Sequence, residues 1–202
     1  MRCSRYYEGR AQRAGACRVA GVDEVGRGAL FGPVVAAAVI LDPARRLAGL
    51  NDSKLLTPEE RAALAPRIRG VAQAWAIAAV DAGQIDAINI YQASRRAMSQ
   101  AVGALSPAPD YLLVDAMALD WGGKQLALPH GDGRSASIAA ASILAKVYRD
   151  ALMCQWHAIF PDYGLMANKG YGTPHHLAAL RRFGVTPLHR RSYAPVAEFL
   201  VS

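Results

Sequence analysis

Two apolar segments near the start of the chain predict adjoining β-strands. Arg18–Val25 is a mostly apolar run that ends in acidic residues, and Val34–Leu41 is apolar at every position. The intervening stretch Gly26–Pro33 has the composition of a turn. Because the second segment is apolar on both faces, we expect a central strand that is covered on both sides. Ala72–Val80 predicts a third strand.

A polar loop and a clear helix start lie between the second and third of these strands. Thr57 is placed as the N-cap, Pro58 as the first helical residue, and Glu60 as the partner that closes a capping box. Pro66 is expected to kink or end this helix, because proline lacks the N–H that the helix needs.

Helical and extended patterns alternate in the rest of the chain. The predicted elements are helices at Ile90–Leu105, from about Ser135 and at Pro174–Phe183, and strands at Tyr111–Asp115 and Gln125–Leu128. The helix from Ser135 has a buried stripe at alternating three- and four-residue steps, formed by Ile138, Ala141, Ala145, Tyr148 and Leu152. Its charged residues Lys146, Arg149 and Asp150 fall away from that stripe.

This order of elements indicates an α/β fold. Three consecutive strands followed by alternating helices and strands favour a mixed sheet with helices on both faces. Asp115 ends its strand at the carboxyl edge, where ligands of open α/β sheets tend to bind. The chain has no internal repeat and no linker long enough to divide it.

The charge distribution points to a polyanionic partner. The 202 residues include 23 Lys and Arg against 16 Asp and Glu, a net charge of +7. The basic residues gather at both ends: no acid occurs from Tyr163 to Ala197, and Glu8 is the single acid before Asp23. A merely solvated cationic surface is the alternative interpretation.

The cysteines and the apolar segments indicate a reducing compartment. Cys3, Cys17 and Cys154 are odd in number and widely spaced, which argues against a disulfide framework and against structural zinc. The first twenty residues contain no apolar core of a signal peptide, and no apolar run is long enough to span a bilayer. We therefore expect a soluble cytoplasmic protein.

Four acids are candidates for chemistry. Asp23 and Glu24 end the first strand and lead into Gly26-Arg27-Gly28, whose backbone N–H groups can approach a phosphate closely. Asp115 ends a second strand, and Asp132 precedes the long helix. Adjacent acids in a regular strand point to opposite faces, so the strand must end or distort at Glu24, or Glu24 contributes partly through its carbonyl.

These acids have the donor atoms of a hard-metal site. Carboxylates without Cys or His partners indicate Mg²⁺ or Mn²⁺ rather than zinc. Two such ions about 3.5–4 Å apart can activate a water and stabilise the leaving oxygen of a phosphodiester. Mutual repulsion should raise some of the carboxyl pKa values when no metal is bound. Solvated turn acids, and ordinary helix capping by Asp132, are the alternatives.

Competing motifs fail on spacing. The Gly26-x-Gly28 pair lacks the third glycine of a dinucleotide fingerprint, because that position is Phe31, and the phosphate-loop motif GxxxxGK[ST] is absent. The neighbouring His175 and His176 face different ways on a helix, which argues against a shared metal.

With these residues in view, the chain closely resembles the type 2 ribonuclease H family, ribonuclease HII. The matching motifs span nearly the whole chain after residue 18. In order they are Gly21 to Gly28 with Gly32 to Val35, Asn51 to Lys54, Leu113 to Asp115, Gly131-Asp132, Ser137 to Val147, Asn168 to Thr173 and Thr186 to Tyr193.

The resemblance implies an RNase H-like fold, a mixed five-stranded sheet flanked by helices with a small helical C-terminal extension. It implies an endonuclease that hydrolyses the RNA strand of RNA–DNA hybrids with two divalent ions, Mg²⁺ or Mn²⁺. It also implies incision 5′ of single ribonucleotides embedded in duplex DNA, leaving 3′-hydroxyl and 5′-phosphate ends. A catalytically idle hybrid-binding protein is the alternative.

The resemblance also assigns roles to residues. Asp23, Glu24, Asp115 and Asp132 match the metal-binding catalytic acids. Gly26, Arg27 and Gly28 match a loop that contacts the ribonucleotide's 2′-hydroxyl, the group that distinguishes RNA from DNA. Tyr171 matches a tyrosine that packs on the sugar at the RNA–DNA junction, while Lys54 and Lys169 match positions suited to phosphate contact.

The chain departs from the family pattern beside Asp132. His130 and Gly133 stand where many members carry Lys and Ser, so a cation and a hydroxyl are lost, and Arg134 is expected to compensate in part. We divide the chain into a basic N-terminal segment 1–17, a catalytic domain 18–160 and a substrate-binding extension 161–202 packed on it. A monomer is expected, and a replication-clamp contact is left open.

Overall fold

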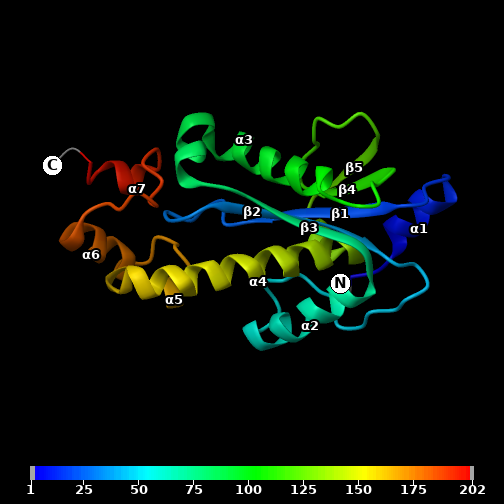
Figure 1. The fold of residues 1–202 in the computed structure, drawn as a ribbon, viewed down its shortest axis with the longest axis horizontal. Coiled ribbons are helices and arrows are strands. Elements are labelled where there is room, and N and C mark those ends of the chain that lie inside the picture. Colours follow the sequence, from blue (N-terminus) through cyan, green and yellow to red (C-terminus); the bar gives the residue numbers. More distant parts are fainter. Residues whose placement is uncertain (1–2, 201–202) are drawn as a thin grey trace.

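A computed structural model describes residues 3–200 and is built around one twisted sheet (Figure 1). Its five strands lie in the order β3-β2-β1-β4-β5. They are β1 (Val19–Val25), β2 (Val34–Leu41), β3 (Ala72–Val80), β4 (Tyr111–Asp115) and β5 (Lys124–Leu128). β1 pairs antiparallel with β2 and parallel with β4, so the sheet changes from antiparallel to parallel at this strand.

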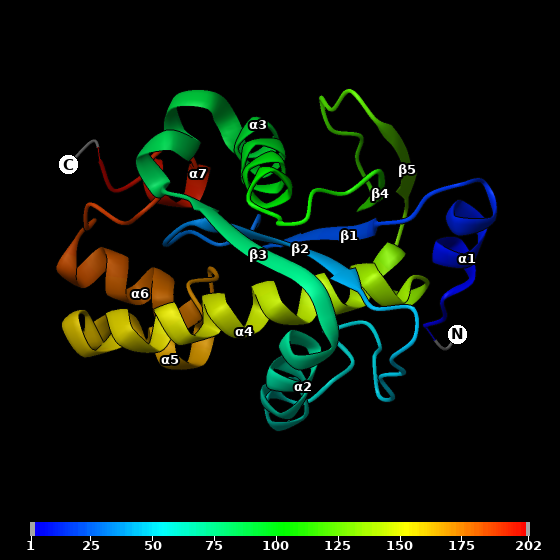
Figure 2. The same cartoon turned by 45° about the vertical axis from the view of Figure 1, so that its right-hand side comes forward.

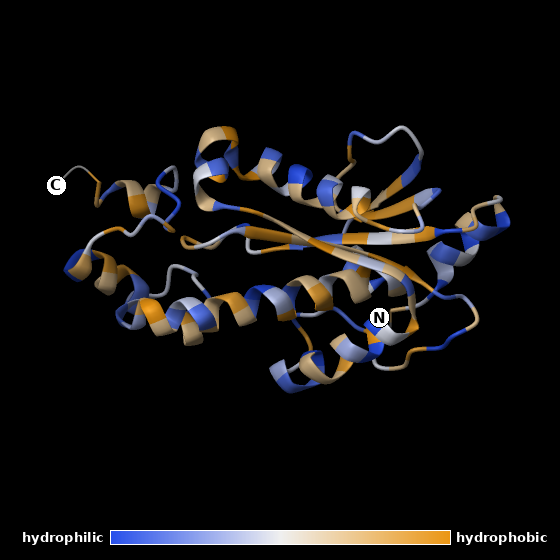
Figure 3. Ribbon diagram, viewed as in Figure 1, coloured by the Kyte–Doolittle hydropathy of each residue, from blue (hydrophilic) through white to orange (hydrophobic). Residues whose placement is uncertain are grey.

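Helices cover both faces of the sheet, as expected (Figure 2). α3 (Ala82–Gly103) lies on one face, while α4 (Ala136–Ile159) and α2 (Pro58–Val71) lie on the other. Alternate β2 residues enter different cores: Ala36, Ala38 and Ile40 pack under α3, and Val35, Ala37 and Val39 pack under α4 and α2. The predicted central position of this strand is therefore correct. The ribbon coloured by hydropathy shows the apolar strands between helices of mixed polarity (Figure 3).

α4 approaches β1 at a glycine. A Cβ atom built on Gly21 would lie 2.1 Å from the carbonyl carbon of Ser137, in the first turn of α4. No real side chain fits at that distance, so the backbones of strand and helix are in direct contact there.

Small helices complete the fold at both ends of the chain. They are α1 (Tyr6–Arg13), α5 (Leu165–Asn168), α6 (Pro174–Phe183), α7 (Ala194–Ala197) and 3₁₀ turns at Gly131–Gly133 and Pro161–Tyr163. The C-terminal ones share a core with Phe31 and with Met153 of α4. Of these, the sequence patterns predicted only α6.

One predicted helix end is not found, and one helical segment was not predicted. α2 continues through Pro66 to Val71, because Leu64, Ala65 and Ile68 bury its inner face, and Pro66 is exposed where water can satisfy the freed carbonyl. The predicted helix start at Ile90 is confirmed within α3, because Asn89 (φ 65°, ψ 163°) separates it from a preceding helical segment that begins at Ala82 and was not predicted. Within residues 3–200, no helix is both long enough and apolar enough to cross a membrane.

Candidate active site

The candidate acids gather at the edge of the sheet where β1 and β4 end. The parallel register pairs Val22 with Val114, so Asp23 and Asp115 are the next residues of two neighbouring strands. Asp132 comes from the 3₁₀ turn before α4, and this turn is joined to β4 because the Gly131 N–H donates to Asp115 Oδ1 at 2.6 Å. Residues far apart in sequence thus meet at one edge, as the sequence predicted.

Asp23 and Asp132 are the most enclosed of these residues, with 4% and 3% of their surface exposed, and Asp23 lies in the strand itself. One of the Asp23 oxygens accepts the Glu24 N–H at 2.8 Å. Burial raises the pKa of Asp23 well above its usual value, and the charges of Glu24 and Asp115 raise it further, whereas a hydrogen bond to Ser142 opposes them. Burial also raises the pKa of Asp115; the Gly131 hydrogen bond and the charge of Lys54 oppose this shift, and the charge of Asp132 adds to it.

Glu24 lies on the strand differently from the expectation. β1 does not end or distort there: its register with β2 runs without a break from Ala20 to Val25. Asp23 and Glu24 therefore point to opposite faces by strand alternation. Burial raises the pKa of Glu24, and Asp115 adds to the shift although Arg27 opposes it, so Glu24 still belongs to the same electrostatic cluster.

One oxygen of Glu24 has no partner in the described part of the chain. Oε1 lies 3.4 Å from the Arg27 guanidinium, whereas Oε2 is buried and without a hydrogen bond. A buried carboxylate oxygen without a donor is costly unless a cation or a donor is supplied from outside the chain.

Lys54 forms an ion pair with Asp132. Its Nζ lies 3.1 Å from Asp132 Oδ2, and the carboxylate side chain is 5% exposed whereas the lysine side chain is 78% exposed. Burial lowers the pKa of Lys54, but the hydrogen bond and the charge of Asp132 outweigh it, so the net shift is upward. The loop that carries Lys54 is fixed to α4 by a 2.8 Å hydrogen bond between the buried hydroxyls of Ser53 and Ser142.

The donor set fits a hard divalent cation. The cluster offers carboxylate oxygens, the unpartnered Glu24 Oε2 and pKa values raised by crowding, and a bound cation would relieve all of this strain. Within residues 3–200, no three His, Cys, Asp or Glu side chains are grouped closely enough to hold an ion as they stand. Coordination by Asp132 therefore requires that Lys54 and the carboxylates shift from these positions.

The Gly26-Arg27-Gly28 loop adjoins the carboxylates and faces Tyr171. Gly26 has φ +92°, and a Cβ there would lie 2.2 Å from Arg149 Nε, so only glycine fits. A Cβ on Gly28 would lie 3.9 Å from Cε1 of Tyr171, whose side chain is partly exposed. The structure thus brings the loop and the tyrosine close together.

Two buried arginines hold this part of the site, and the sequence reasoning misjudged both. Arg149 was expected to face away from the buried stripe of its helix, yet it is fully buried and donates to the carbonyls of Phe31, Pro33 and Lys169 at 2.8–3.1 Å. Burial lowers its pKa to about 10. Its guanidinium carbon also lies 5.7 Å from the centre of the Tyr171 ring.

Arg190 is likewise inside the molecule rather than on a basic surface. It donates to the carbonyls of Gly32 and Arg27 at 2.9 and 2.8 Å, and Tyr193 OH also donates to the Arg27 carbonyl. The Arg27 carbonyl, in the middle of the glycine loop, is therefore held by two side chains from the interior of the protein. The number of basic residues near the C-terminus did not indicate that Arg190 is buried.

Two other basic side chains lie away from the acids. Lys169 Nζ donates to the Met166 carbonyl at 2.6 Å instead of pointing toward the carboxylates. Arg134 donates to the Pro129 carbonyl at 3.1 Å and to Tyr7 OH, so the expected compensation for His130 and Gly133 is not seen.

The N-terminal segment, for which the sequence gave no role, clamps the Asp132 turn. The buried Glu8 accepts hydrogen bonds from Ser135 Oγ and from the Ser137 N–H, at 2.7 and 2.8 Å, at the start of α4. Ser4 forms backbone bonds with both Arg134 and Ala136. A carboxylate at a helix N-terminus is favourable, so Glu8 stabilises α4 where Asp132 enters it.

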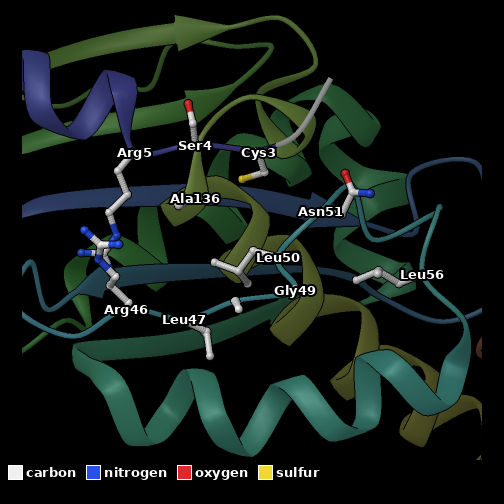
Figure 4. Close-up of a pocket in the computed structure, with 11 residues that line it drawn as sticks. Cys3, Ser4, Arg5, Arg46, Leu47, Gly49, Leu50, Asn51, Leu56 and Ala136 are labelled. Carbon is white, nitrogen blue, oxygen red and sulfur yellow. The ribbon is translucent and has the colours of Figure 1, made fainter.

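A cavity of about 820 Å³ lies beside this clamp but holds none of the four acids (Figure 4). Arg5 and Arg46 stand together on one side, and Leu47 and Leu50 line its apolar part. Burial, with a smaller contribution from Glu8, raises the pKa of the Cys3 thiol on its wall to about 12. The acids instead lie at the sheet edge where β1 and β4 end.

Comparison with known sequences gives a consistent result. A model of the family described as ribonuclease HII matches residues 20–196. A ribonuclease HII of Koribacter versatilis is 60% identical over 196 residues, which cover 97% of this chain and 77% of that protein. A ribonuclease HII of Solibacter usitatus is also 60% identical, over 97% of this chain and 86% of its own length.

Solved structures share the fold. Ribonuclease H2 from Pyrococcus horikoshii OT3 superposes with a TM-score of 0.79 at 25% identity, over 91% of this chain and 97% of that one. The RNase HII in a PCNA complex from Archaeoglobus fulgidus gives 0.75 at 26%, over 90% and 96%. Bst-RNase HIII in complex with Mn²⁺ gives 0.70 at 25%, over 95% and 71%.

Proposed function

The chain belongs to the ribonuclease HII family and is a ribonuclease H endonuclease, and from this premise we propose how its site acts. The family acts on the RNA strand of RNA–DNA hybrids. We propose that this chain also incises duplex DNA on the 5′ side of a single embedded ribonucleotide, leaving 3′-hydroxyl and 5′-phosphate ends.

The proposal rests mainly on one observation: the sheet edge that carries the four carboxylates lies next to the place where Gly28 and Tyr171 approach each other. A carboxylate cluster alone could serve many phosphodiesterases. A glycine loop whose backbone is fixed by Arg190 and Tyr193 adds rigid N–H donors that can read a 2′-hydroxyl without reading the base. In this proposal the Tyr171 ring packs on the neighbouring sugar.

The metal-holding residues are proposed to be Asp23, Glu24, Asp115 and Asp132. Two Mg²⁺ or Mn²⁺ ions bound there would supply an activated water and would stabilise the leaving oxygen. The Mn²⁺ complex of Bst-RNase HIII, a protein of the same fold, supports this choice of metal. The chain's own contribution is to hold the carboxylates at a fixed edge of the sheet and to keep Asp23 away from bulk water.

The basic residues have separate proposed tasks. Lys54 holds the Asp132 carboxylate in the metal-free protein and is released toward substrate phosphate when a cation takes its place. Lys169, at the end of α5, contacts phosphate farther along the strand. We propose that residues 161–202 form the substrate-binding extension, since they share a core with Phe31 and Met153.

A cleavage map tests the proposal. A labelled DNA duplex with one ribonucleotide is incubated with Mg²⁺ or Mn²⁺, and the product ends are identified by mass spectrometry. We expect a single cut 5′ of the ribonucleotide that EDTA abolishes. Binding without any cut would instead support the idle hybrid-binding protein, and cutting at deoxynucleotides would refute the assigned role of the loop.

The remaining expectations stay predictions. Action as a monomer and a cytoplasmic location are proposed on the sequence alone. The PCNA complex concerns the Archaeoglobus fulgidus protein, and a clamp contact of this chain is still to be tested.

A further inference from the structure

Two buried histidines lie behind the tyrosine loop and have no part in the carboxylate site. His176, on α6, and His189, in the loop after it, are 0% and 1% exposed. Their Nε2 atoms lie 3.0 Å apart, a hydrogen bond between two rings. Phe31 and Tyr163 enclose the pair, with ring centres 4.9 and 5.1 Å from that of His189.

The surrounding partners fix which nitrogens carry protons. His176 Nδ1 lies 3.0 Å from the Tyr171 carbonyl, which can only accept, so this nitrogen is protonated. His189 Nδ1 accepts the Thr186 N–H at 3.0 Å, so that nitrogen is bare. His189 Nε2 must then donate to His176 Nε2, and both rings are neutral.

The chain of hydrogen bonds has one direction, from Thr186 through His189 and His176 to Tyr171. A further proton on either ring would set two donors against each other. In agreement, burial lowers the pKa of both histidines, that of His189 to about 3. The pair therefore stays in one tautomeric state at neutral pH.

The accepting carbonyl belongs to a loop whose other carbonyls are also held from inside. The Lys169 carbonyl accepts from Arg149, and the Gly170 carbonyl accepts the Leu30 N–H at 2.8 Å. The Tyr171 carbonyl accepts from His176 and from the Thr173 N–H at 2.8 Å, so His176 is its one partner outside the loop.

We propose that the His176–His189 pair is a positioning element that fixes the Tyr171 backbone, and so places the Tyr171 ring beside Gly28. The inference rests on the proposed function, in which that ring contacts the sugar. His176 and His189 would influence catalysis only through the position of Tyr171.

Two substitutions of His176 distinguish a role in positioning Tyr171 from a role in merely filling the core. In His176→Asn the amide nitrogen takes the place of Nδ1 and can still donate to the Tyr171 carbonyl. In His176→Gln the amide takes the place of Nε2 and retains only the contact with His189. Each variant loses one ring hydrogen bond, and His176→Asn leaves the larger void because Asn has one methylene fewer than Gln. A mere core role therefore predicts that His176→Asn is at least as harmful as His176→Gln, the opposite of the positioning role.

The readout is the ratio of kcat/KM on the single-ribonucleotide duplex to kcat/KM on a continuous hybrid. We expect His176→Gln to lower this ratio by about tenfold, the effect of one net hydrogen bond, and His176→Asn to stay within about twofold of the unaltered protein. His175→Asn, on the exposed neighbour, is the matched control and should leave the ratio unchanged. Equal ratios in the two His176 variants would overturn the proposal.

Two further measurements keep the inference testable if a variant folds poorly. Long-range ¹H–¹⁵N spectra of the unaltered protein should show a proton on Nδ1 of His176 and on Nε2 of His189, and the opposite tautomers would refute it. Tyr171→Ala separates the two levels of argument. If it leaves the ratio unchanged, the proposed role of Tyr171 fails; if it lowers the ratio while His176→Gln does not, only the positioning role fails.

Discussion

Two neighbouring regions of the molecule, here called the acid edge and the platform, differ in whether their buried charged groups have partners within the chain. At the acid edge (Asp23, Glu24, Asp115 and Asp132), like charges are crowded together and one oxygen of Glu24 is left without a partner. In the platform (Arg149, Arg190, His176 and His189), each arginine is bonded to backbone carbonyls and each histidine is kept neutral. In the proposed function the edge takes cations from outside the chain. The platform instead supplies most of its own partners, although Arg190 Nη2 has no hydrogen bond among the described residues.

We infer from this difference that the acid edge carries out the chemistry, whereas the platform supports the recognition loop. A region that is stable without a ligand can hold a recognition loop rigidly before substrate arrives. A region under electrostatic strain binds metal strongly but is a poor scaffold alone. The predictions below test whether the two regions divide the work in this way.

Removal of one carboxylate should cost most in activity. Asp115→Asn keeps the size of the side chain and its acceptor for the Gly131 N–H, but it removes a proposed metal ligand. We expect turnover on the single-ribonucleotide duplex to fall by about 10³-fold, because metal assistance supplies several kcal/mol. Duplex binding, measured by fluorescence anisotropy, should change little. Asp120→Asn, at an exposed acid, is the control, and near-normal turnover of Asp115→Asn would remove it from the site.

Loss of a platform arginine should act on stability instead. Arg149→Lys keeps a charge but cannot reach the carbonyls of Phe31, Pro33 and Lys169 together. Urea unfolding should show a loss of about 3 kcal/mol, since buried carbonyls are left unsatisfied. Arg182→Lys, at an exposed arginine, should change stability by less than about 0.5 kcal/mol. Comparable losses in both variants would contradict the idea of a self-satisfied platform.

The two regions should respond to pH with opposite signs. His189 has its pKa lowered from 6.5 to about 3, so below pH 6.5 the unfolded chain takes up a proton that the folded chain refuses. Its contribution is therefore lost as the pH falls from about 6.5 toward 3, by at most about 1.4 kcal/mol per pH unit. The His189→Gln variant should lack this slope.

The raised carboxyl pKa values act in the other direction. Folded Asp23, Glu24 and Asp115 hold their protons to higher pH than the unfolded chain does, so this stability is present at low pH. It is lost as the pH rises through the raised pKa values, and only in the metal-free protein, because bound cations favour the ionised form. Unfolding curves with EDTA and with Mg²⁺, from about pH 4 to about pH 8, measure both slopes. Identical curves would mean that the edge is not strained.

The smallest effect is expected at the clamp on the Asp132 turn. Glu8→Gln keeps one acceptor oxygen but removes the charge at the N-terminus of α4, so we expect a loss of about 1 kcal/mol. Glu198→Gln, outside the clamp, is the matched control. Thermal unfolding of both variants in EDTA measures the difference, and an unchanged Glu8→Gln would reduce the clamp to a surface contact.

The acid edge could be predicted from the sequence, but the platform could not. Asp23 and Asp115 each end an apolar segment, and the ends of parallel strands meet at one sheet edge, so local patterns were sufficient. The capping box at Thr57 and the helix start near Ser135 were equally local, and both occur in the structure, where Ser135 is the N-cap. The expected break at Glu24 is not found, because β1 stays paired with β2 through Val25, and the alternative, a contribution through the Glu24 carbonyl, stays a prediction.

Arg149 shows why the platform was missed. Its partners are backbone carbonyls, which every residue possesses and which leave no pattern in a sequence. A helical stripe of apolar residues predicts that an arginine beside it faces water, and only the tertiary fold brings the turn 31–33 over it. Glu8 was missed for the same reason, since its partners at the start of α4 lie about 130 residues away in the chain.

The close approach of Gly21 to Ser137 has a consequence for the whole edge. Asp23 follows Gly21 by two residues, and Asp132 precedes Ser137 by five, so both carboxylates are attached close to one main-chain junction. Their spacing is thereby set by atoms that every variant of the chain shares, not by the choice of side chains in the core. Substitutions elsewhere in the interior can therefore change the stability of the protein while leaving the distance between these two carboxylates unchanged.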